Sequence, residues 1–255
     1  MITYPLMIKH IYQRELTSLF RTPFAWVMLS IGTALIAYQF LSQIEFFLAV
    51  SDKLKSLEEP PGVSELVVLP TVNFCALLLI FLVPITTMQS ITGERRGSTL
   101  QLVMSSPISM LSFVIGKFLS VVTLFGLLWV ITATMSLSLM WGARLDLGLC
   151  LGALLGIGLF TAMATSIGLL MSSLFKQPAA AGAATLGTLL FIWFCDWVGK
   201  AGGQENLFSH LAAANHFDKI ANGLFDTFNI CYFIIASGLA LMLTNWRLSN
   251  EHYQG

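Results

Sequence analysis

The sequence contains little charge. Of its 255 residues only 10% are Asp, Glu, Lys or Arg, whereas 56% are hydrophobic, and the mean hydropathy is +0.80. Soluble globular domains carry about 25% charged residues. Because a chain with less than half of that share cannot cover a water-facing surface with polar side chains, the composition excludes a soluble protein and indicates an integral membrane protein.

Cysteine is also sparse, which bears on metal and disulfide chemistry. Cys75, Cys150, Cys195 and Cys231 occur one to a hydrophobic run, and none belongs to a CxxC or Cys/His spacing. A metal cluster is therefore not expected. A disulfide between Cys195 and Cys231 stays open beside the favoured interpretation that the thiols are small buried hydrophobic side chains.

Alternating polar and apolar positions, the pattern of a membrane β-barrel, are missing. The apolar residues form continuous runs of roughly 20 residues, the length that a helix needs to cross about 30 Å of hydrocarbon. We therefore expect an all-α, polytopic protein with one transmembrane domain over residues 1–255. The third run is too long for a straight crossing, so it must tilt or begin along the interface. The six expected spans cover residues 24–44, 66–88, 111–141, 147–171, 179–198 and 228–246.

Basic residues are distributed unevenly between the connections, and they predict the orientation. The short loops at 89–110 and 172–178 carry the clearest excess of Lys and Arg, and the positive-inside rule places such loops in the cytoplasm. With six spans, both termini then lie in the cytoplasm as well. The loops at 45–65 and 199–227 lie outside, and the second is expected to form a pair of short interfacial helices.

The chain begins with a segment of helical periodicity ahead of the first run. Hydrophobic residues recur at helical spacing over positions 8–20, while Lys9, Arg14 and Arg21 lie on the opposite face. This pattern predicts a basic amphipathic helix along the inner leaflet, followed by Pro23 at the turn into the membrane. An extended cytoplasmic start to the first membrane helix is the alternative.

Ionisable residues are nearly missing from the six runs, where Glu45 and Asp196 stand at the predicted outer ends. A charged group near the bilayer centre costs on the order of 3 kcal/mol and usually marks an ion path. Their scarcity argues against a proton-coupled transporter, an ion channel and a carboxylate-lined path for cations. His210, His216 and Asp218 leave a membrane-embedded enzyme as an alternative, although we expect them to be polar groups of a surface loop.

A nucleotide-binding loop is missing too, although the stretch at 93–100 has the glycines and arginines of a phosphate-binding segment. Three residues, not four, separate Gly93 from Gly97, no Lys follows Gly97, and a membrane helix rather than a buried strand precedes the stretch. We therefore expect neither nucleotide binding nor any other cofactor in this chain.

The same stretch predicts a short cytoplasmic helix. Ser98 and Gln101 have the spacing of a capping box, in which the first side chain accepts from an amide near the start of a helix. Ser106 and Pro107 end this helix, and Pro107 is expected at the first position of the next one. Because two helical turns are not stable alone in water, the helix must pack on the bilayer or on a partner.

The stretch GERRGSTLQLVMSSPISMLSFVIGKFLS, residues 93–120, resembles a segment of ABC-2 type ABC-transporter permeases. Other stretches in the same order are similar to that family, from RELTSLFRTPFAWV at 14–27 to NLFSHLAAANHFDKIANGLFDTFNICYFI at 206–234. The likeness is greatest to the gliding-associated, Gld-type branch. The residues that match the family pattern are Glu94, Arg95, Arg96, Gly97, Thr99, Leu100, Pro107, Ser109, Gly116 and Lys117.

The resemblance implies a permease subunit in the bacterial inner membrane, without catalysis of its own, that couples ATP hydrolysis by a separate ATPase to export or mechanical work. In such permeases the helix between spans two and three seats in a groove of the ATPase. Gln101 stands where a Glu is usual, which removes a charge that could meet a basic partner surface. The implied coupling residues are Glu94, Arg95, Arg96, Gly97, Thr99, Leu100, Gln101 and Val103.

The resemblance also implies the partners of the chain. They are two copies of an ATPase subunit that binds ATP, a second or paralogous permease, and a Gld-type partner with a periplasmic domain, besides membrane lipid; no nucleic acid is expected. A non-transporting membrane anchor for an ATPase is the alternative, because the sequence shows no substrate cavity.

Small residues also predict close helix packing, at Gly152, Gly156, Gly182 and Gly187.

Overall fold

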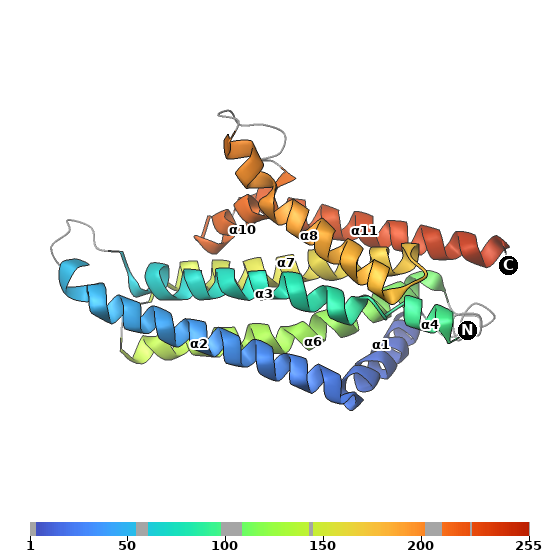
Figure 1. Cartoon of the computed structure of the whole chain (residues 1–255), viewed down its shortest axis with the longest axis horizontal. Coiled ribbons are helices and arrows are strands. Elements are labelled where there is room, and N and C mark those ends of the chain that lie inside the picture. Colours follow the sequence, from blue (N-terminus) through green and yellow to red (C-terminus); the bar gives the residue numbers. More distant parts are fainter. Residues whose placement is uncertain are drawn as a thin grey trace.

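The computed structural model describes residues 4–54, 61–97, 109–142, 145–201, 211–224 and 226–254, and all the regular elements in this part of the chain are helices (Figure 1). The long helices lie roughly side by side along one axis. The elements are α1 (Tyr4–Arg21), α2 (Pro23–Leu54), a π-helical turn (Ser64–Val68), α3 (Leu69–Thr87), α4 (Thr92–Arg96), α6 (Met110–Ser138), a 3-10 turn (Leu139–Trp141), α7 (Leu147–Leu174), α8 (Pro178–Ala201), α10 (Ala213–Ala221) and α11 (Thr227–Gln254).

Within the described residues, six helices are long and apolar enough to cross a membrane, which confirms the predicted all-α, polytopic architecture. Five of these segments contain an expected apolar run in full, and the fifth segment, Pro178–Cys195, ends before the expected limit at 198. The first, second and sixth segments extend several residues beyond the expected runs, because helical hydrogen bonding continues past the last apolar side chain. The membrane-length segments are Pro23–Ser51, Ser64–Arg96, Met110–Trp141, Leu147–Leu174, Pro178–Cys195 and Thr227–Glu251.

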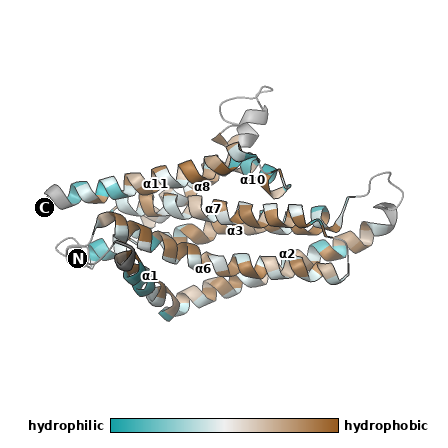
Figure 2. Cartoon of the chain, turned by 180° about the vertical axis from the view of Figure 1, so that it is seen from behind, coloured by the Kyte–Doolittle hydropathy of each residue, from teal (hydrophilic) through white to brown (hydrophobic). Residues whose placement is uncertain are grey.

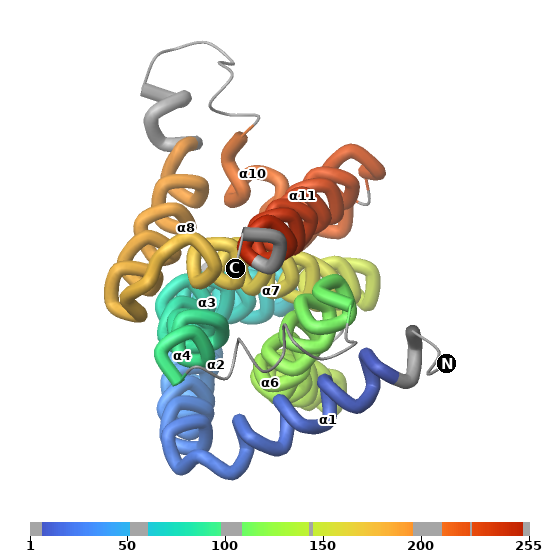
Figure 3. Tube along the Cα trace, turned by 90° about the vertical axis from the view of Figure 1, so that its right-hand side faces the viewer, coloured from blue at the N-terminus to red at the C-terminus, as the bar shows by residue number. Residues whose placement is uncertain are grey.

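Helix α7 lies at the centre of the bundle and packs on α3, α6, α8, α10 and α11 (Figure 3). In the most hydrophobic 18-residue stretch of α7, 56% of the residues are buried, and the share is the same for the segment that contains α3. The corresponding share is only 28% in α8 and in α11, so α3 and α7 form the interior. Small residues such as Gly152, Ala153, Gly156 and Ala164 on α7 let its neighbours approach closely. The less buried helices keep apolar side chains for lipid.

Helix α1 is separate from the first membrane helix, as the amphipathic pattern predicted. It ends at Arg21, and α2 begins at Pro23, where the missing N–H and restricted φ suit a first helical position. The two helices meet at an angle, and α1 crosses the start of α6 (Figures 1 and 3). The alternative of one extended first helix is therefore wrong.

Two features of the structure differ from the sequence predictions. Helix α6 begins at Met110, where the side chain of Ser109 accepts from the backbone N–H of Ser112, so Pro107 is not its first residue; Pro107 itself lies outside the described residues. Helix α10 was expected to lie at the membrane interface, but one of its faces, with His216, Phe217 and Ile220, is buried against the bundle. The other helix expected in that loop falls on 202–210, outside the described part.

Both chain ends lie at the same end of the bundle as α1 and α4 (Figure 1). Hydrophobic residues line the long helices, whereas hydrophilic residues gather in α1, in α10 and at the end of α11 (Figure 2). An even number of crossings requires this placement of the termini. The basic loops predict that this end is the cytoplasmic one.

Candidate functional site

The predicted coupling residues divide between α4 and a segment that the structure does not describe. Glu94, Arg95 and Arg96 lie on α4, and Gly97 follows its last turn. The remaining predicted residues lie outside the described residues; they are Thr99, Leu100, Gln101 and Val103.

Glu94 belongs to a buried ion-pair cluster that joins three helices. The Lys117 ammonium on α6 lies 2.9 Å from Oε1 of Glu94 on α4 and 3.1 Å from Oε2 of Glu15 on α1. Arg14 on α1 lies 3.0 Å from Glu15 and 3.5 Å from Glu94 at the solvent edge of the cluster. Because Lys117 is only 2% exposed, these pairs must replace the hydration that its charge has lost.

Gly116 explains how α1 comes close enough to reach Lys117. A Cβ at position 116 would lie only 2.6 Å from Cγ2 of Ile11, so any side chain there would push α1 away from α6. About two turns further along α6, the hydroxyl of Thr123 lies 3.2 Å from that of Tyr12. The adjacent Gly116 and Lys117 therefore act together, the first admitting α1 and the second binding Glu15.

The sequence interpretation did not foresee this cluster. It named Lys117 only as a match to the family pattern, whereas the structure buries the side chain inside the third membrane-length helix. The available signal was the small number of acidic residues predicted on the same side of the membrane, because only Glu15, Glu94 and Glu251 could compensate a lysine in an apolar run. Position along the sequence alone could not show that they meet.

The neighbouring charges keep Glu15 ionised. Burial by itself raises the pKa of Glu15, but the Lys117 ammonium and the Arg14 guanidinium together outweigh this effect, so the pKa of Glu15 lies below its usual value. At neutral pH the carboxylate is therefore charged. Its ion pair with Lys117 is retained until the pH falls through that lowered value.

Arg95, the next residue of α4, attaches this helix to the opposite side of the bundle. Its Nη2 lies 2.7 Å and 2.9 Å from the two carboxylate oxygens of Glu251 on α11. The same guanidinium donates to the carbonyl oxygens of Ser173 at 3.1 Å and Phe175 at 3.2 Å, at the end of α7. A cation there binds carbonyl groups that have no partner within the helix and interacts favourably with the helix dipole.

Helix α4 is also fastened through its backbone. The Ser172 hydroxyl on α7 accepts from the N–H groups of Ile91 at 3.0 Å and Thr92 at 3.2 Å. It therefore serves as an N-cap supplied by another helix. Beneath it, a small apolar cluster joins α1, α6, α7 and α11 to the start of α4. Its members are Ile11, Ile91, Phe113, Val114, Leu169 and Leu248.

Arg96 and Gly97, in contrast, are exposed where the chain leaves α4. Adjacent residues on one helical turn thus have different environments: Glu94 and Arg95 are committed to the bundle, and the next two face solvent. Arg96 and Gly97 therefore follow directly on a firmly anchored helical turn.

Three of the four glycines predicted to pack helices lie at contacts. A Cβ at Gly152 would meet the carbonyl oxygen of Ile220 and lie 3.1 Å from Cα of Gly223; at Gly156 it would lie 3.3 Å from the Phe217 ring. At Gly182 it would lie 3.3 Å from the Met88 side chain. At Gly187 no atom of another described element lies within 4 Å of such a Cβ, so its packing role stays a prediction.

Two of the three residues of the alternative enzyme site are described, and they differ in exposure. His216 is buried rather than on a surface loop; its Nδ1 lies 2.7 Å from Oδ1 of Asn229, and its ring stacks on Tyr232 with centroids 4.3 Å apart. Asp218 is exposed, and His210 lies outside the described residues. No group of three metal-binding side chains occurs in the described part of the chain, and all four cysteines are free.

Comparison with known proteins agrees with this architecture. No curated protein sequence matches the chain. The family model described as ABC-2 family transporter protein matches residues 9–244, which include all of the ion-pair cluster and nearly all of the six membrane-length segments. This family comprises multi-pass membrane components of ABC transporters and implies an ABC ATPase partner. The chain therefore belongs to the ABC-2 family of transporter proteins.

Proposed function

We propose that the chain is a permease subunit that couples ATP hydrolysis by a separate ATPase subunit to export, or to mechanical work, across the bacterial inner membrane. The observation that carries this proposal is the double attachment of α4. Glu94 pairs with Lys117 on α6, and Arg95 pairs with Glu251 on α11 and binds the end of α7. A force applied to the segment after Gly97 would reach both halves of the bundle through these contacts.

The physical basis is the cost of separating buried charges. Removing one partner of a buried pair leaves an uncompensated charge and costs about 3–5 kcal/mol. Lys117 and its carboxylates therefore move together when α4 moves, and α1 follows through Glu15. Tilting of packed helices about such fixed contacts is a common way to carry a local displacement through a protein.

The assembly that we propose contains two ATPase copies and a second permease, either identical or paralogous. The ATPase binds ATP, and this chain performs no catalysis. The motif at residues 93–120 favours the Gld-type branch, in which a partner with a periplasmic domain would complete the complex. The segment from Gly97 to Val103 is the proposed docking element for the ATPase.

Docking is tested by changing Leu100 and Val103 together to Asp. Charges placed in an apolar groove would lose their hydration, so a tagged permease should no longer co-purify the ATPase. Lys219→Ala is the control, since this residue is exposed on α10 at the opposite end. Full retention of the ATPase by the double variant, at equal membrane levels, would show that the segment does not dock it.

A second experiment distinguishes coupling from simple anchoring of the ATPase. Glu94→Gln with Arg95→Gln should retain the ATPase, because the docking residues are unchanged, but should abolish ATP-dependent movement between spin labels on α2 and α11. Tyr38 and Met242 suit the labels, as their side chains are 73% and 70% exposed. Equal movement in the variant and the parent would contradict the proposed path of force.

A further inference from the structure

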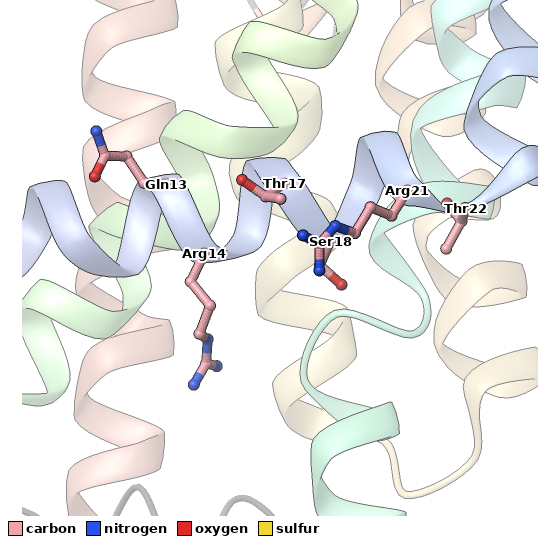
Figure 4. Close-up of a pocket in the computed structure, with 6 residues that line it drawn as sticks. All are labelled: Gln13, Arg14, Thr17, Ser18, Arg21 and Thr22. Carbon is pink, nitrogen blue, oxygen red and sulfur yellow. The ribbon is translucent and has the colours of Figure 1, made fainter.

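Two adjoining hollows lie where α1 meets α2. The larger, of about 1210 Å³, has an apolar wall of side chains from α2, α3 and α6, and its inner end is lined by Glu15, Glu94 and Lys117 of the ion-pair cluster. The apolar wall consists of Phe24, Ala25, Ile85, Val121 and Leu124. The smaller, of about 530 Å³, is lined by six polar side chains of the α1 end, which Figure 4 shows along one stretch of that helix. These are Gln13, Arg14, Thr17, Ser18, Arg21 and Thr22.

The two hollows adjoin along Arg14, Ser18 and Thr22, which line both, and together they are called the groove. The side of the groove over α1 is polar, and its wall between the membrane-length helices is mainly apolar. An amphipathic molecule could match both sides at once. A small hydrophilic anion would match only the first.

The rim of the groove formed by α1 is positively charged, and Glu94, which lines the larger hollow, is paired with Lys117. Lys9, Arg14 and Arg21 are exposed on α1, and Glu15 is the single acidic residue of that helix. Glu15 is committed to Lys117 and Arg14, so it does not neutralise Arg21. Guanidinium groups and hydroxyls such as that of Ser18 are donors that suit a phosphate oxygen.

The position of the groove along the bundle corresponds to the headgroup region of a membrane. Just beyond Pro23, the side chains of Phe24, Trp26 and Val27 are 55%, 55% and 56% exposed, which places apolar surface next to the basic face. Trp26 donates its indole N–H to the carbonyl oxygen of Phe20 at 2.8 Å. Tryptophan is enriched at this level, where one part of the ring is in hydrocarbon and the N–H is near water.

We propose that this groove binds an anionic phospholipid of the adjacent leaflet, with its phosphate against Arg21 and Ser18 and one acyl chain against the apolar wall. The basic rim selects the anionic headgroup, and the wall between α2, α3 and α6 selects a lipid over free phosphate. The bound lipid would brace α1 against α2 beside the Glu15–Lys117–Glu94 cluster. Since it binds the folded protein, it would also raise the unfolding temperature.

The experiment measures thermal unfolding of the full chain, purified in detergent and stripped of lipid, while phosphatidylglycerol, phosphatidylcholine or inorganic phosphate is titrated. Phosphatidylglycerol should raise the unfolding temperature at the lowest concentration, phosphatidylcholine only at higher concentration, and phosphate not at all. A shift with phosphate alone would overturn the lipid assignment. Equal shifts with both lipids would overturn the role of the basic rim.

Matched variants locate the site. Arg21→Gln should weaken the phosphatidylglycerol response by at least about tenfold, the effect of one charge-assisted hydrogen bond. Lys9→Gln removes the same charge from the same helix outside the groove, and should weaken it by about fivefold at most, through long-range attraction. Equal losses in the two variants would mean diffuse attraction to the membrane surface and no site.

The apolar wall is tested separately. Thr86 lines the groove on α3, and Thr86→Phe would fill the space proposed for the acyl chain. This variant should lose the response to both lipids while its unfolding temperature without lipid stays near that of the parent. An unchanged lipid response would show that no chain enters the groove, and Arg21→Gln gives an independent answer if Thr86→Phe does not fold.

Discussion

The two ends of the bundle are held together by different forces. At the end with α1 and α4, charged side chains bridge helices, and Lys117 is 2% exposed between two carboxylates. At the end with α10, backbones approach closely and aromatic rings pack, with Gly152 against the Ile220 carbonyl and Phe217 against Phe160 at a centroid distance of 6.1 Å.

The difference matters for movement. Ion pairs can exchange partners over a short distance: Arg14 reaches both Glu15 and Glu94, and Glu251 reaches both Arg95 and Arg247. Close backbone packing tolerates no such exchange, because contact energy falls steeply when surfaces separate. At the end with α4, Arg14 and Glu251 can therefore change partners while the buried contacts of Lys117 persist, and the end with α10 stays fixed.

The largest expected contrast between the ends is accessibility from outside the cell. In a background without the native cysteines, Lys219→Cys on α10 should react with a membrane-impermeant maleimide in intact cells, whereas Arg96→Cys on α4 should react only after lysis. Both positions are exposed and outside the ion-pair cluster. Labelling of position 96 from outside would reverse the predicted orientation.

The next contrast is in the free energy of unfolding, measured by chemical denaturation in detergent. Lys117→Met leaves Glu15 and Glu94 facing each other without the buried cation, and should cost about 3–5 kcal/mol. Arg96→Gln removes an exposed cation from the same end and should change stability by less than about 0.5 kcal/mol.

A charge-free version sharpens this test. Adding Glu15→Gln and Glu94→Gln to Lys117→Met removes the uncompensated carboxylates, so most of the lost stability should return. If Lys117→Met cost no more than Arg96→Gln, charge would not be what holds this end together.

The smallest contrast compares two glycines and probes the packed end. Gly152→Ala places a Cβ against the Ile220 backbone, which cannot rotate away, and should destabilise by about 1–3 kcal/mol. Gly187→Ala meets nothing within 4 Å among the described residues and should stabilise by up to about 1 kcal/mol through helix propensity. The same denaturation measurement checks both, and equal signs would contradict the packing assigned to α10.

The features that could be predicted depend on local patterns. Six apolar runs and the periodicity before Pro23 were enough for the membrane helices and for α1, because bilayer thickness and helical rise act on each segment separately. The start of α6 was misplaced because Ser109 competes with Pro107 as a start signal, and both are compatible with the local sequence.

The environments that the sequence did not predict depend on partners in other elements. Lys117 and Glu15 are separated by 102 positions, and the His216 ring on α10 contacts Asn229 and Tyr232 of α11. No other described element contacts Gly187, because small size permits a close approach without requiring one.

The sequence by itself determined that this chain lies in a membrane, how many helices cross it and which family it belongs to, since apolar length and a local motif suffice for each. Only the tertiary structure decided that Glu94 and Arg95, neighbours on α4, attach to different sides of the bundle, through Lys117 and Glu251. The reason is physical: a charge can be buried only where an opposite charge meets it, and that meeting is set by helix packing over the whole chain.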